Sequence, residues 1–551
     1  MSLDVFTFLV GGRAGEGVKK AGSVAAQLFI TKGRYVFQMD DYMSLIRGGH
    51  NFSVVSTSTR WISSQYLKAD LVVCFDQRSY DKHKTHLSKA GFLIYNADKV
   101  EGDTGIGIPL SKEAKSYPRP DLMLGVGAVA ILAALIDYSK DMLEMLITEE
   151  YPFGIENNIS YANKIYNLVY PEIGGLIKIN DGDKKRTHIY GNYAIALGAI
   201  AGGLDVYYAY PMTPASSILH YLAALAEDYG LAIIHPENEI AVINMAVGSA
   251  FTGAKTIVGT SGGGFALMTE GLSFAGMVEA PVLCILSQRP GPATGVPTYT
   301  AQGDLNFALS AGHGEFLRII ASPGTIEEAF YLTAKMLDLV WKYQTPGILL
   351  IEKHLSESAM TVDIDVSKAA WAEPELAMEG SYKRYIDTYT GISPMLFPPS
   401  KEVIKWNSHE HDEFGITTEE SKIVSQMHEK RMRKIESLKS YLKGFKTINI
   451  YGDRGAIILT YGSTTMSVLE AIKFGNLEAM VIQIIYLNPL PIWELKKYSS
   501  KEIIVVEQSI GCQFSNLIRE KAGLSVKNVI NAYDGRPFDP IDLANKLREV
   551  I

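Results

Sequence analysis

Short apolar runs alternate along this chain with stretches in which apolar residues recur every three or four positions. Residues 5–10 form such a run and predict a buried strand, a glycine-rich turn follows at 11–17, and the spacing over 18–31 predicts a helix. Another apolar run at 71–75 continues the alternation. Strands and helices that alternate in this way predict an α/β layer with mainly parallel strands over residues 1–180.

Three further segments follow, each with its own pattern. After a polar hinge at 180–191, strand and helix patterns alternate again over 191–366 and once more over 446–551. Residues 367–445 are rich in charges and poor in apolar runs, so we expect an irregular excursion that ends in a solvated helix at 419–442. Together with the first segment, the sequence predicts an α/β protein of three α/β domains, interrupted by a charged excursion and linker helix.

Composition and charge exclude some classes of function. The 551 residues carry a formal net charge of −8, so no basic surface is expected for a nucleic-acid backbone. The longest apolar run, 122–136, is shorter than the roughly 20 residues that cross a bilayer, and it predicts a buried helix and no membrane partner. The first ten residues lead directly into a strand without a signal-peptide pattern, and we expect a cytoplasmic protein.

Cysteine and histidine residues show no metal-binding spacing. Cys74, Cys284 and Cys512 are far apart, which argues against a disulfide framework, a zinc site or a self-contained iron–sulfur cluster and favours three buried thiols. His409 and His411 lie beside two acids, but in a segment so rich in charges a solvated face is the better interpretation.

The most informative segment follows an apolar strand at 204–209. A turn with two prolines comes directly after this strand and presents the Thr213 hydroxyl. Glu237 and Glu239 then open a helix of small residues, and Arg289 lies in a loop rich in glycine and proline. Taken alone, these residues have ordinary interpretations, as acids in the first turn of a helix and as a surface cation.

Four motifs stand in order within this segment. They are YPMTPAS at 210–216, ENEIAV at 237–242, TSGGGF at 260–265 and QRPGPATGVPT at 288–298. They resemble the YPITPSS, EDEIAA, TSGPGF and QRGGPSTGLPT motifs of the alpha subunit of the thiamine diphosphate-dependent 2-oxoacid:ferredoxin oxidoreductases. Order and spacing agree in all four cases, so the chain is identified as a member of that family.

The resemblance extends over nearly the whole chain. The glycine turn and the RGG segment at 47–49 are similar to the family's gamma subunit, the excursion is similar to its GISP and EHDE blocks, and LNPLP at 487–491 resembles a transketolase C-terminal domain. This implies a gamma-type domain at 1–180, a pyrimidine-type thiamine diphosphate-binding domain at 191–366 and a transketolase C-terminal-like domain at 446–551. Such a fused gamma–alpha chain works with a separate beta subunit.

The resemblance also assigns roles to individual residues. Thiamine diphosphate is activated when a carboxyl group hydrogen-bonds N1′ of its aminopyrimidine ring, and the motif points to Glu239 for this role, with Glu237 as the alternative. Arg289 suits the substrate carboxylate because its planar fork pairs bidentately and stays charged. Thr213 and Thr294 match substrate-binding threonines, and Thr213 counts with Glu239 and Arg289 as catalytic. Further cofactor contacts are implied for Tyr210, Pro211, Ser261 and Gly262.

The chain departs from the family's motifs at several positions. These are Tyr193, Met212, Ala215, Gly263, Pro290 and Ala293. The loss of a serine hydroxyl at Ala215 and Ala293 predicts a preference for less polar 2-oxoacids, whereas the excursion favours the broad-specificity or 2-oxoglutarate branch. The preferred 2-oxoacid stays open.

Residues that would hold the diphosphate of the cofactor are missing from the sequence. Thiamine enzymes bind it through Mg²⁺ with a GDG motif, which this chain lacks, and the DGD at 181–183 is typical of a turn. The resemblance therefore implies that Mg²⁺ and a [4Fe–4S] cluster belong to the beta subunit. The implied reaction is oxidative decarboxylation of a 2-oxoacid with coenzyme A, which gives acyl-CoA and CO₂ and passes electrons to ferredoxin.

Other interpretations stay in view. A catalytically inactive or regulatory paralogue would keep the fold, and a non-oxidative thiamine diphosphate enzyme would act without a partner. Gly12, Gly15 and Gly17, followed by Asp40, resemble a dinucleotide fingerprint, but their GxxGxG spacing favours a tight turn. A turn of this kind at a helix N-terminus is also able to receive an anionic group, such as part of coenzyme A.

Overall fold

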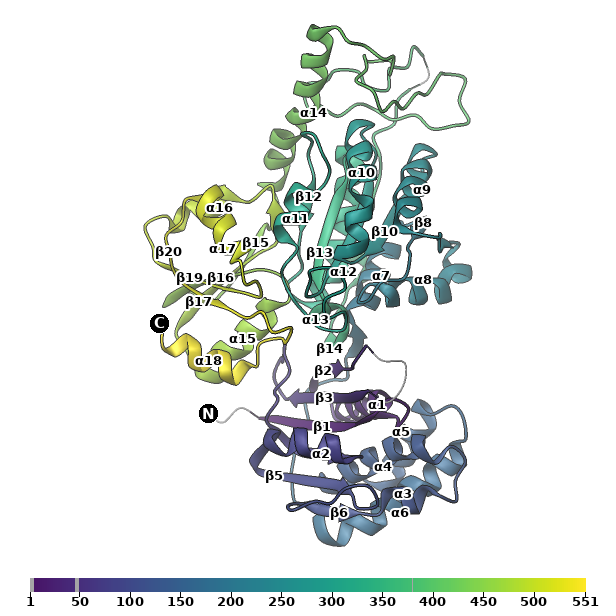
Figure 1. The fold of residues 1–551 in the computed structure, drawn as a ribbon, viewed down its shortest axis with the longest axis vertical. Helices are drawn as coiled ribbons and strands as arrows, with labels where there is room; N and C mark the ends of the chain where they lie inside the picture. The colour runs from purple at the N-terminus through teal and green to yellow at the C-terminus, as the bar shows by residue number, and fades with distance from the viewer. Residues whose placement is uncertain (1–3, 45–48, 379) are drawn as a thin grey trace.

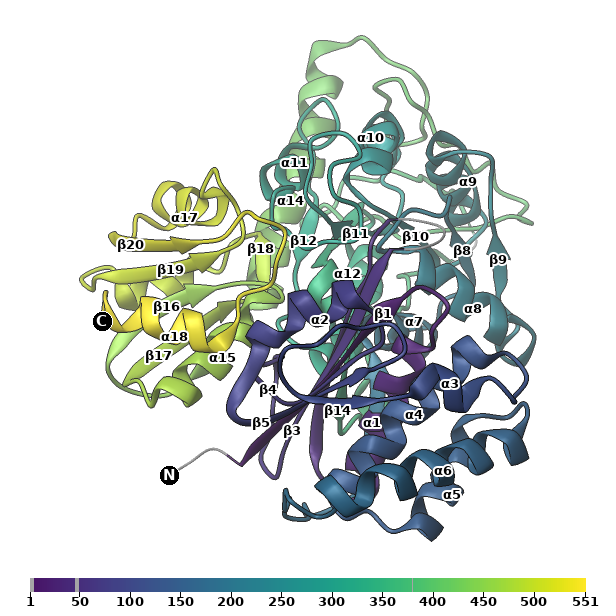
Figure 2. The same cartoon turned by 60° about the horizontal axis from the view of Figure 1, so that its bottom comes forward.

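The computed structural model describes residues 1–551 except 1–3, 45–48 and 379. Figure 1 shows three sheets with helices packed on them: the first part of the chain at the bottom, the second in the middle and the C-terminal part to the left. The excursion lies at the top, farthest from the first sheet. Figure 2 shows the same arrangement from below, with the first sheet turned towards the viewer.

The first sheet has eight strands in the order β6-β5-β4-β1-β3-β2-β14-β7. Their bounds are β1 Val5–Arg13, β2 Tyr35–Asp41, β3 His50–Ser58, β4 Ala69–Cys74, β5 Leu87–Asn96, β6 Ile106–Ile108, β7 Thr187–Tyr190 and β14 Ser358–Val362. The pairs β6-β5, β5-β4 and β4-β1 are parallel. The pairs β1-β3, β3-β2, β2-β14 and β14-β7 are antiparallel. The prediction of mainly parallel strands was therefore wrong here, because the 42–49 connection is too short for a parallel crossover.

Helices pack on both faces of this sheet, because Tyr80 shares a core with Leu9 whereas the helical residues 123–135 share another core with Phe8 and Val10. The helices are α1 Val18–Thr31, α2 Gln77–His83, the short η1 Lys84–His86, α3 Leu110–Ala114, α4 Pro120–Leu135, α5 Lys140–Glu150 and α6 Ile155–Ile173. Helix α4 is buried without interruption from Met123 to Leu135, which confirms the buried helix predicted from the apolar run. Among the helices of the described residues, none combines the length and apolarity needed to span a membrane.

The second sheet has the strand order β18-β12-β13-β11-β10-β8-β9. Its strands are β8 Val206–Tyr208, β9 Ala232–Ile234, β10 Thr256–Thr260, β11 Val282–Gln288, β12 Ile319–Ala321, β13 Gly347–Glu352 and β18 Tyr486–Asn488. All neighbours are parallel except β12 and β18. Its helices are α7 Gly191–Ala201, α8 Ser216–Tyr229, α9 Glu239–Phe251, α10 Gly262–Met277, α11 Leu305–Ser310, α12 Ile326–Tyr343 and α13 Lys353–Ser356. Helices on both faces explain why β10 and β11 are buried at every position.

The third sheet has the order β15-β17-β16-β19-β20. Its strands are β15 Ile448–Tyr451, β16 Ala456–Thr460, β17 Ala479–Ile484, β19 Ile503–Glu507 and β20 Val526–Asn531. The helical segments around it are α15 Thr464–Gly475, α16 Ile492–Leu495, η3 Lys496–Tyr498, α17 Gln513–Leu517, η4 Ile518–Ala522 and α18 Pro540–Arg548. Strands β17, β16, β19 and β20 are parallel to one another, and β15 is antiparallel to β17.

Strands cross between the three parts of the chain. β7 comes from the predicted polar hinge and β14 from the predicted 191–366 segment, yet both complete the first sheet. β18 follows β17 in the C-terminal segment but pairs with β12 of the second sheet. The three segments of the sequence are therefore tied to one another by main-chain hydrogen bonds within shared sheets, which fixes how the first and second parts face each other. The domain limits themselves stay a prediction.

The excursion corrects two expectations. Helix α14 (Ser421–Leu442), which follows η2 (Val366–Lys368) and the irregular segment, was predicted to be solvated, but Lys430 and Lys434 are buried against Glu279. The Lys430 Nζ lies 2.8 Å from Oε1 of that carboxylate. His411 is also buried, with its ring 3.9 Å from the Tyr385 ring, so the solvated face predicted for it was wrong, whereas His409 is exposed as predicted. A charged segment can be buried when its charges meet a partner on another element.

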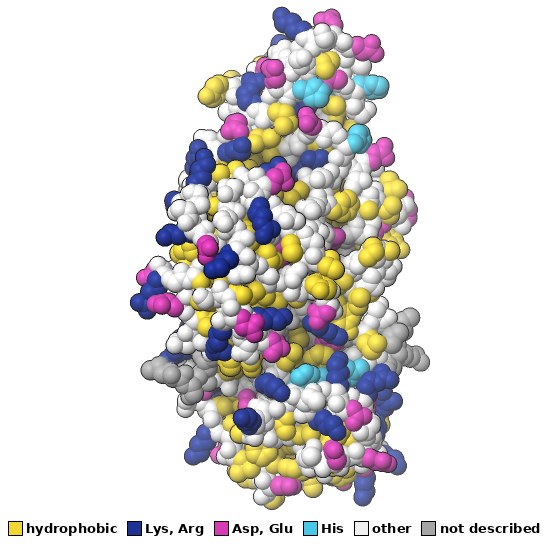
Figure 3. Space-filling model, turned by 60° about the vertical axis from the view of Figure 1, so that its left-hand side comes forward, with side chains coloured by type: hydrophobic (Ala, Val, Ile, Leu, Met, Phe, Trp, Pro, Cys, Tyr) yellow, Lys and Arg dark blue, Asp and Glu magenta, His cyan; other side chains and the backbone are white. Residues whose placement is uncertain are grey.

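Charged side chains are mixed on the surface. Figure 3 shows one face on which lysine and arginine side chains are spread along the molecule with aspartate and glutamate among them. No continuous basic stripe crosses this face. That distribution agrees with the net charge of −8.

Candidate functional site

The four motifs meet at one edge of the second sheet. β9, β8, β10 and β11 are neighbours and run parallel, so their carboxyl ends lie side by side. Glu239 follows β9, Thr213 follows β8, Ser261 follows β10 and Arg289 follows β11. The chain passes from β8 to β9 on one side and then returns to β10 on the other. Ligands of open α/β sheets bind at such a reversal, outside the carboxyl ends of the strands.

Glu239 is the first residue of α9, and its side chain is 3% exposed. The preceding Asn238 caps the helix by accepting a hydrogen bond of 3.0 Å from the Ala241 main-chain N–H. The Oε1 atom of Glu239 is buried and has no hydrogen-bond partner among the described residues. Glu237, the alternative, is exposed. Of the two acids, Glu239 and not Glu237 has the buried carboxyl group expected of a residue that binds an aminopyrimidine ring.

The first turn of α10 lies against this carboxylate. A Cβ added at Gly264 would stand 2.4 Å from Glu239 Oε1, whereas one added at Gly263 would have no atom within 4 Å. Ser261, which precedes the helix, has a buried hydroxyl without a partner among the described residues. Buried polar atoms in proteins are almost always hydrogen-bonded. Two unpaired polar atoms beside an open glycine turn therefore fit the polar edge of a ring such as an aminopyrimidine.

Arg289 is tied to the Thr213 loop. Its Nη1 donates a hydrogen bond of 2.8 Å to the main-chain carbonyl of Thr213. Burial lowers the pKa of Arg289, the nearby Asp304 carboxylate opposes this shift, and a guanidinium stays charged in either case. Thr213 and Arg289 are both partly buried, so a carboxylate that reaches them gives up much of its water.

The remaining predicted residues lie at the margin of this group. Tyr210 is 40% exposed, with its ring in an edge contact with His235, and Pro211 is partly buried. Gly262 is the first residue of α10, next to Ser261. Thr294 is exposed in the loop that follows Arg289, so the structure does not bring it into the buried group.

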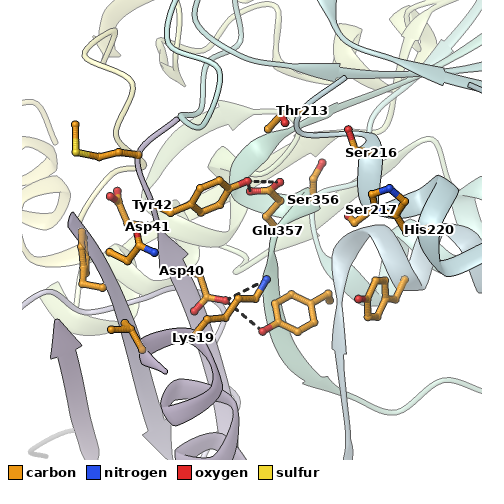
Figure 4. Close-up of a pocket in the computed structure, with 16 residues that line it drawn as sticks. Lys19, Asp40, Asp41, Tyr42, Thr213, Ser216, Ser217, His220, Ser356 and Glu357 are labelled. Carbon is orange, nitrogen blue, oxygen red and sulfur yellow. Dashed lines mark hydrogen bonds and ion pairs between the residues drawn. The ribbon is translucent and has the colours of Figure 1, made fainter. Parts of the chain in front are cut away.

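A cleft of about 410 Å³ separates the Thr213 loop from the first part of the chain. Figure 4 shows Lys19, Asp40, Asp41 and Tyr42 on one side and Thr213, Ser216, Ser217 and His220 on the other, with Ser356 and Glu357 between them. The Tyr42 hydroxyl lies 2.8 Å from both carboxylate oxygens of Glu357. No sequence pattern pointed to most of these residues, because they come together through the pairing of β14 with β2.

The glycine turn beside this cleft has the geometry of a tight turn. β1 continues through Arg13, so the turn begins later than predicted, and Gly15 and Gly17 have positive φ values of 96° and 76°. Asp40 is engaged by Ser53, whose hydroxyl donates a 2.7 Å hydrogen bond to it, so it is not a free ribose acceptor. Within the RGG segment at 47–49, residues 47 and 48 lie outside the described residues.

Metal-binding groups are absent from the described part of the chain. No cluster of three or more histidine, cysteine, aspartate or glutamate residues there could hold a metal ion. Cys74 and Cys284 are buried as predicted, and Cys512 is partly exposed.

Comparisons with known proteins identify the family. A family model described as pyruvate flavodoxin/ferredoxin oxidoreductase, thiamine diphosphate-binding, matches residues 197–432, and one described as pyruvate ferredoxin/flavodoxin oxidoreductase matches 7–168. The 2-oxoacid:ferredoxin oxidoreductase subunit alpha of a Sulfolobus species is 31% identical in an alignment 620 positions long, which covers 99% of this chain and 97% of that one. This chain belongs to the 2-oxoacid:ferredoxin oxidoreductase family.

Two further members of the family show how the chain is organised. The 2-oxoglutarate:ferredoxin oxidoreductase of Magnetococcus marinus, solved with 2-oxoglutarate, coenzyme A and succinyl-CoA bound, is 27% identical with a TM-score of 0.91 over 99% of both chains. The 2-oxoglutarate synthase subunit KorA of Methanothermobacter marburgensis is 27% identical over 97% of its own length but 65% of this chain. This chain thus extends beyond the part that matches KorA, and the resemblance drawn from the four motifs is confirmed.

Proposed function

We propose that this chain supplies the aminopyrimidine side and the substrate-carboxylate clamp of a 2-oxoacid:ferredoxin oxidoreductase. With a beta subunit it catalyses the coenzyme A-dependent oxidative decarboxylation of a 2-oxoacid in the cytoplasm, where coenzyme A and ferredoxin are found. One observation carries the proposal. The buried, unpaired Glu239 carboxylate follows β9 and the Arg289 guanidinium follows β11, and both strands end at the same edge of one sheet.

Glu239 is the residue suited to hold the cofactor's ring. Its unpaired Oε1 would accept or share a proton with N1′ of the aminopyrimidine, and the adjacent Ser261 hydroxyl offers a second polar contact. When bound, thiamine diphosphate supplies a nucleophilic carbon for the 2-oxo group and accepts the electrons left by departing CO₂. Because Glu239 is capped and packed against Gly264, its carboxylate is positioned before any ligand arrives.

Arg289 and Thr213 are suited to orient the substrate. The guanidinium uses Nη1 to bind the Thr213 carbonyl, which leaves its other N–H groups for a carboxylate. This bond fixes the side chain in place, so that less conformational freedom is lost when the 2-oxoacid binds. The Thr213 hydroxyl faces the cleft from the same loop, where it is placed to donate a hydrogen bond to a substrate oxygen.

The cleft provides a route for coenzyme A. It opens between the first part of the chain and the Thr213 loop, so a thiol arm lying in it would reach the substrate end of the site. Hydroxyl groups line its walls together with Lys19 and the acidic residues Asp40, Asp41 and Glu357, and these polar groups suit the amides of a pantetheine arm. The structure of the Magnetococcus relative was solved with coenzyme A bound, which supports this assignment.

The outer face of α9 and α10 is the surface proposed for the beta subunit. Ile240, Met245 and Leu267 are exposed there by 52%, 40% and 51%, beside the helix turns that hold Glu239. Exposed apolar side chains that gather at half of an active centre mark a protein interface. The partner would add the Mg²⁺ site for the diphosphate and the [4Fe–4S] cluster that leads to ferredoxin.

A matched pair of variants tests the proposal. The chain is reconstituted with its beta subunit, and reduction of ferredoxin is measured with a panel of 2-oxoacids and coenzyme A. We expect Glu239→Gln to lower kcat/KM by about 100-fold or more, because a proton-transfer group typically contributes at least that much. Glu237→Gln, two residues away but exposed, should stay within about twofold, the range of a surface change.

The outcome also separates the alternatives. If the two variants lose activity equally, Glu239 has no special part in catalysis. If the wild-type complex reduces ferredoxin with none of the acids, the chain is an inactive or regulatory paralogue. The panel further shows whether the alanines at 215 and 293 shift preference towards less polar acids than 2-oxoglutarate.

A further inference from the structure

Asp304 is a carboxylate beside Arg289 that the reaction proposed above does not use. It precedes α11, and its main-chain N–H donates a 2.9 Å hydrogen bond to Gln288 Oε1, the residue before Arg289. A Cβ added at Gly262 would lie 2.8 Å from Asp304 Oδ2, so the carboxylate rests on the first turn of α10. The first turn of α10 is thus flanked by two carboxylates, those of Asp304 and Glu239.

The Asp304 carboxylate has no hydrogen-bond donor of its own in the described part of the chain, although it lies near a helix N-terminus. The cation that attracts the Asp304 carboxylate is the Arg289 guanidinium. The two groups do not form an ion pair in the described structure, because no N–O distance between them is 4.0 Å or less. Tyr461, on the C-terminal part of the chain, and Glu239, across the α10 turn, are the other titratable groups that face it. Arg289 is therefore the cation that balances Asp304 while the site is empty.

A substrate carboxylate changes this balance. Burial already raises the pKa of Asp304 to about 6, and Arg289 opposes the rise. A 2-oxoacid that pairs with Arg289 neutralises that opposing charge and brings a second negative charge into the same partly buried space. Both effects favour the neutral acid form of Asp304. The negative charge of the bound substrate is then compensated by a proton that Asp304 takes from solvent.

We propose that Asp304 is a positioning residue that balances Arg289 in the empty site and takes up a proton when the substrate carboxylate binds. The inference rests on the proposed function, because it requires Arg289 to bind a carboxylate. It makes substrate binding pH-dependent. At pH values above the pKa of Asp304 in the empty site, KM should rise by up to about tenfold per pH unit, because one proton binds with each substrate molecule. The value of kcat should change much less.

Calorimetry of the complete complex gives a readout that does not need turnover. The wild-type chain with its beta subunit is titrated with oxamate, a 2-oxoacid analogue that does not lose CO₂, in two buffers of different ionisation enthalpy. We expect about one proton to be taken up per site at pH 7 in the wild type and about none in Asp304→Asn, whose amide keeps the shape and cannot be protonated. The slope of log KM against pH should disappear in the same variant.

The possible failures differ from one another. Oxamate binding without proton uptake in the wild type, or equal uptake in Asp304→Asn, would overturn the inference and leave the proposed function standing. Absence of any binding that depends on Arg289 would overturn both. If Asp304→Asn does not fold, the proton count of the wild type still decides, because zero uptake is incompatible with the role proposed for Asp304.

Discussion

Gly264 offers a direct test of how firmly the Glu239 carboxylate is held. An alanine Cβ at this position would stand 2.4 Å from Glu239 Oε1 and 2.3 Å from Thr260 Oγ1. Ordinary van der Waals contact begins at 3.4 Å. The Thr260 and Glu239 side chains must therefore both give way, and the Glu239 carboxylate moves by about 1 Å.

The size of the effect follows from that displacement. A misplacement of about 1 Å in a catalytic group costs on the order of 100-fold in rate. The free energy of unfolding should change less. Replacing glycine by alanine inside a helix raises it by about 1 kcal/mol, whereas overpacking lowers it by about 1–3 kcal/mol. Gly264→Ala should therefore fold with its unfolding free energy lowered by no more than about 2 kcal/mol, while kcat/KM falls about 100-fold.

The assay combines two measurements on the same preparation. Denaturant unfolding of the chain gives the change in stability, with Gly248→Ala as the control, because that glycine lies in α9 with no atom within 4 Å of an added Cβ. Ferredoxin reduction by the reconstituted complex gives kcat/KM. The substitution is also made in a Glu239→Gln background, where the catalytic loss from Gly264→Ala should be much smaller because both act through one carboxylate. A folded Gly264→Ala enzyme within about threefold of wild-type activity would refute this reasoning, because a displacement of about 1 Å should lower the rate far more than threefold.

Three further outcomes are expected. Arg289→Lys should raise KM for the 2-oxoacid by about 10- to 100-fold with a smaller change in kcat, because one point charge replaces a two-pronged fork; steady-state kinetics would show it. Burial lowers the pKa of Lys434 to about 7, so the folded chain holds fewer protons than the unfolded chain between about pH 7 and its ordinary value of 10.5. The unfolding free energy should therefore rise with pH across that window, and a Lys434→Met variant that kept the full rise in denaturant titrations would contradict this. Gly198→Ala should lower the melting temperature by several degrees, because the added Cβ would lie 2.2 Å from the Phe330 main-chain oxygen, which cannot turn away; Gly248→Ala again serves as the control.

Local sequence patterns predict secondary structure correctly where the information lies within the element itself. Helix α1 spans the residues predicted from apolar spacing, and the apolar run at 122–136 is a buried helix. The four motifs identified the family, because each holds several residues in fixed order around one strand end. Burial then separated Glu239 from Glu237, two acids that the sequence presents in nearly the same setting.

Burial of the charged segments is predicted less well, because their surroundings are formed by residues elsewhere in the chain. The lysines of α14 look solvated in the sequence, yet Lys430 and Lys434 contact Glu279, which lies more than 150 residues away from each of them. A pattern of charges records which residues are polar. It does not record whether a partner lies across the fold.

The sequence by itself determined the family, the strands and helices that carry its motifs, and the residue types able to hold a ring nitrogen and a carboxylate. Tertiary structure alone decided which of those residues meet. The exchange of β7, β14 and β18 between sheets, the cleft beneath Thr213 and the position of Asp304 beside Arg289 all depend on contacts between segments far apart in the chain. Periodicity records only the face a residue presents within its own element, so no local pattern encodes these contacts.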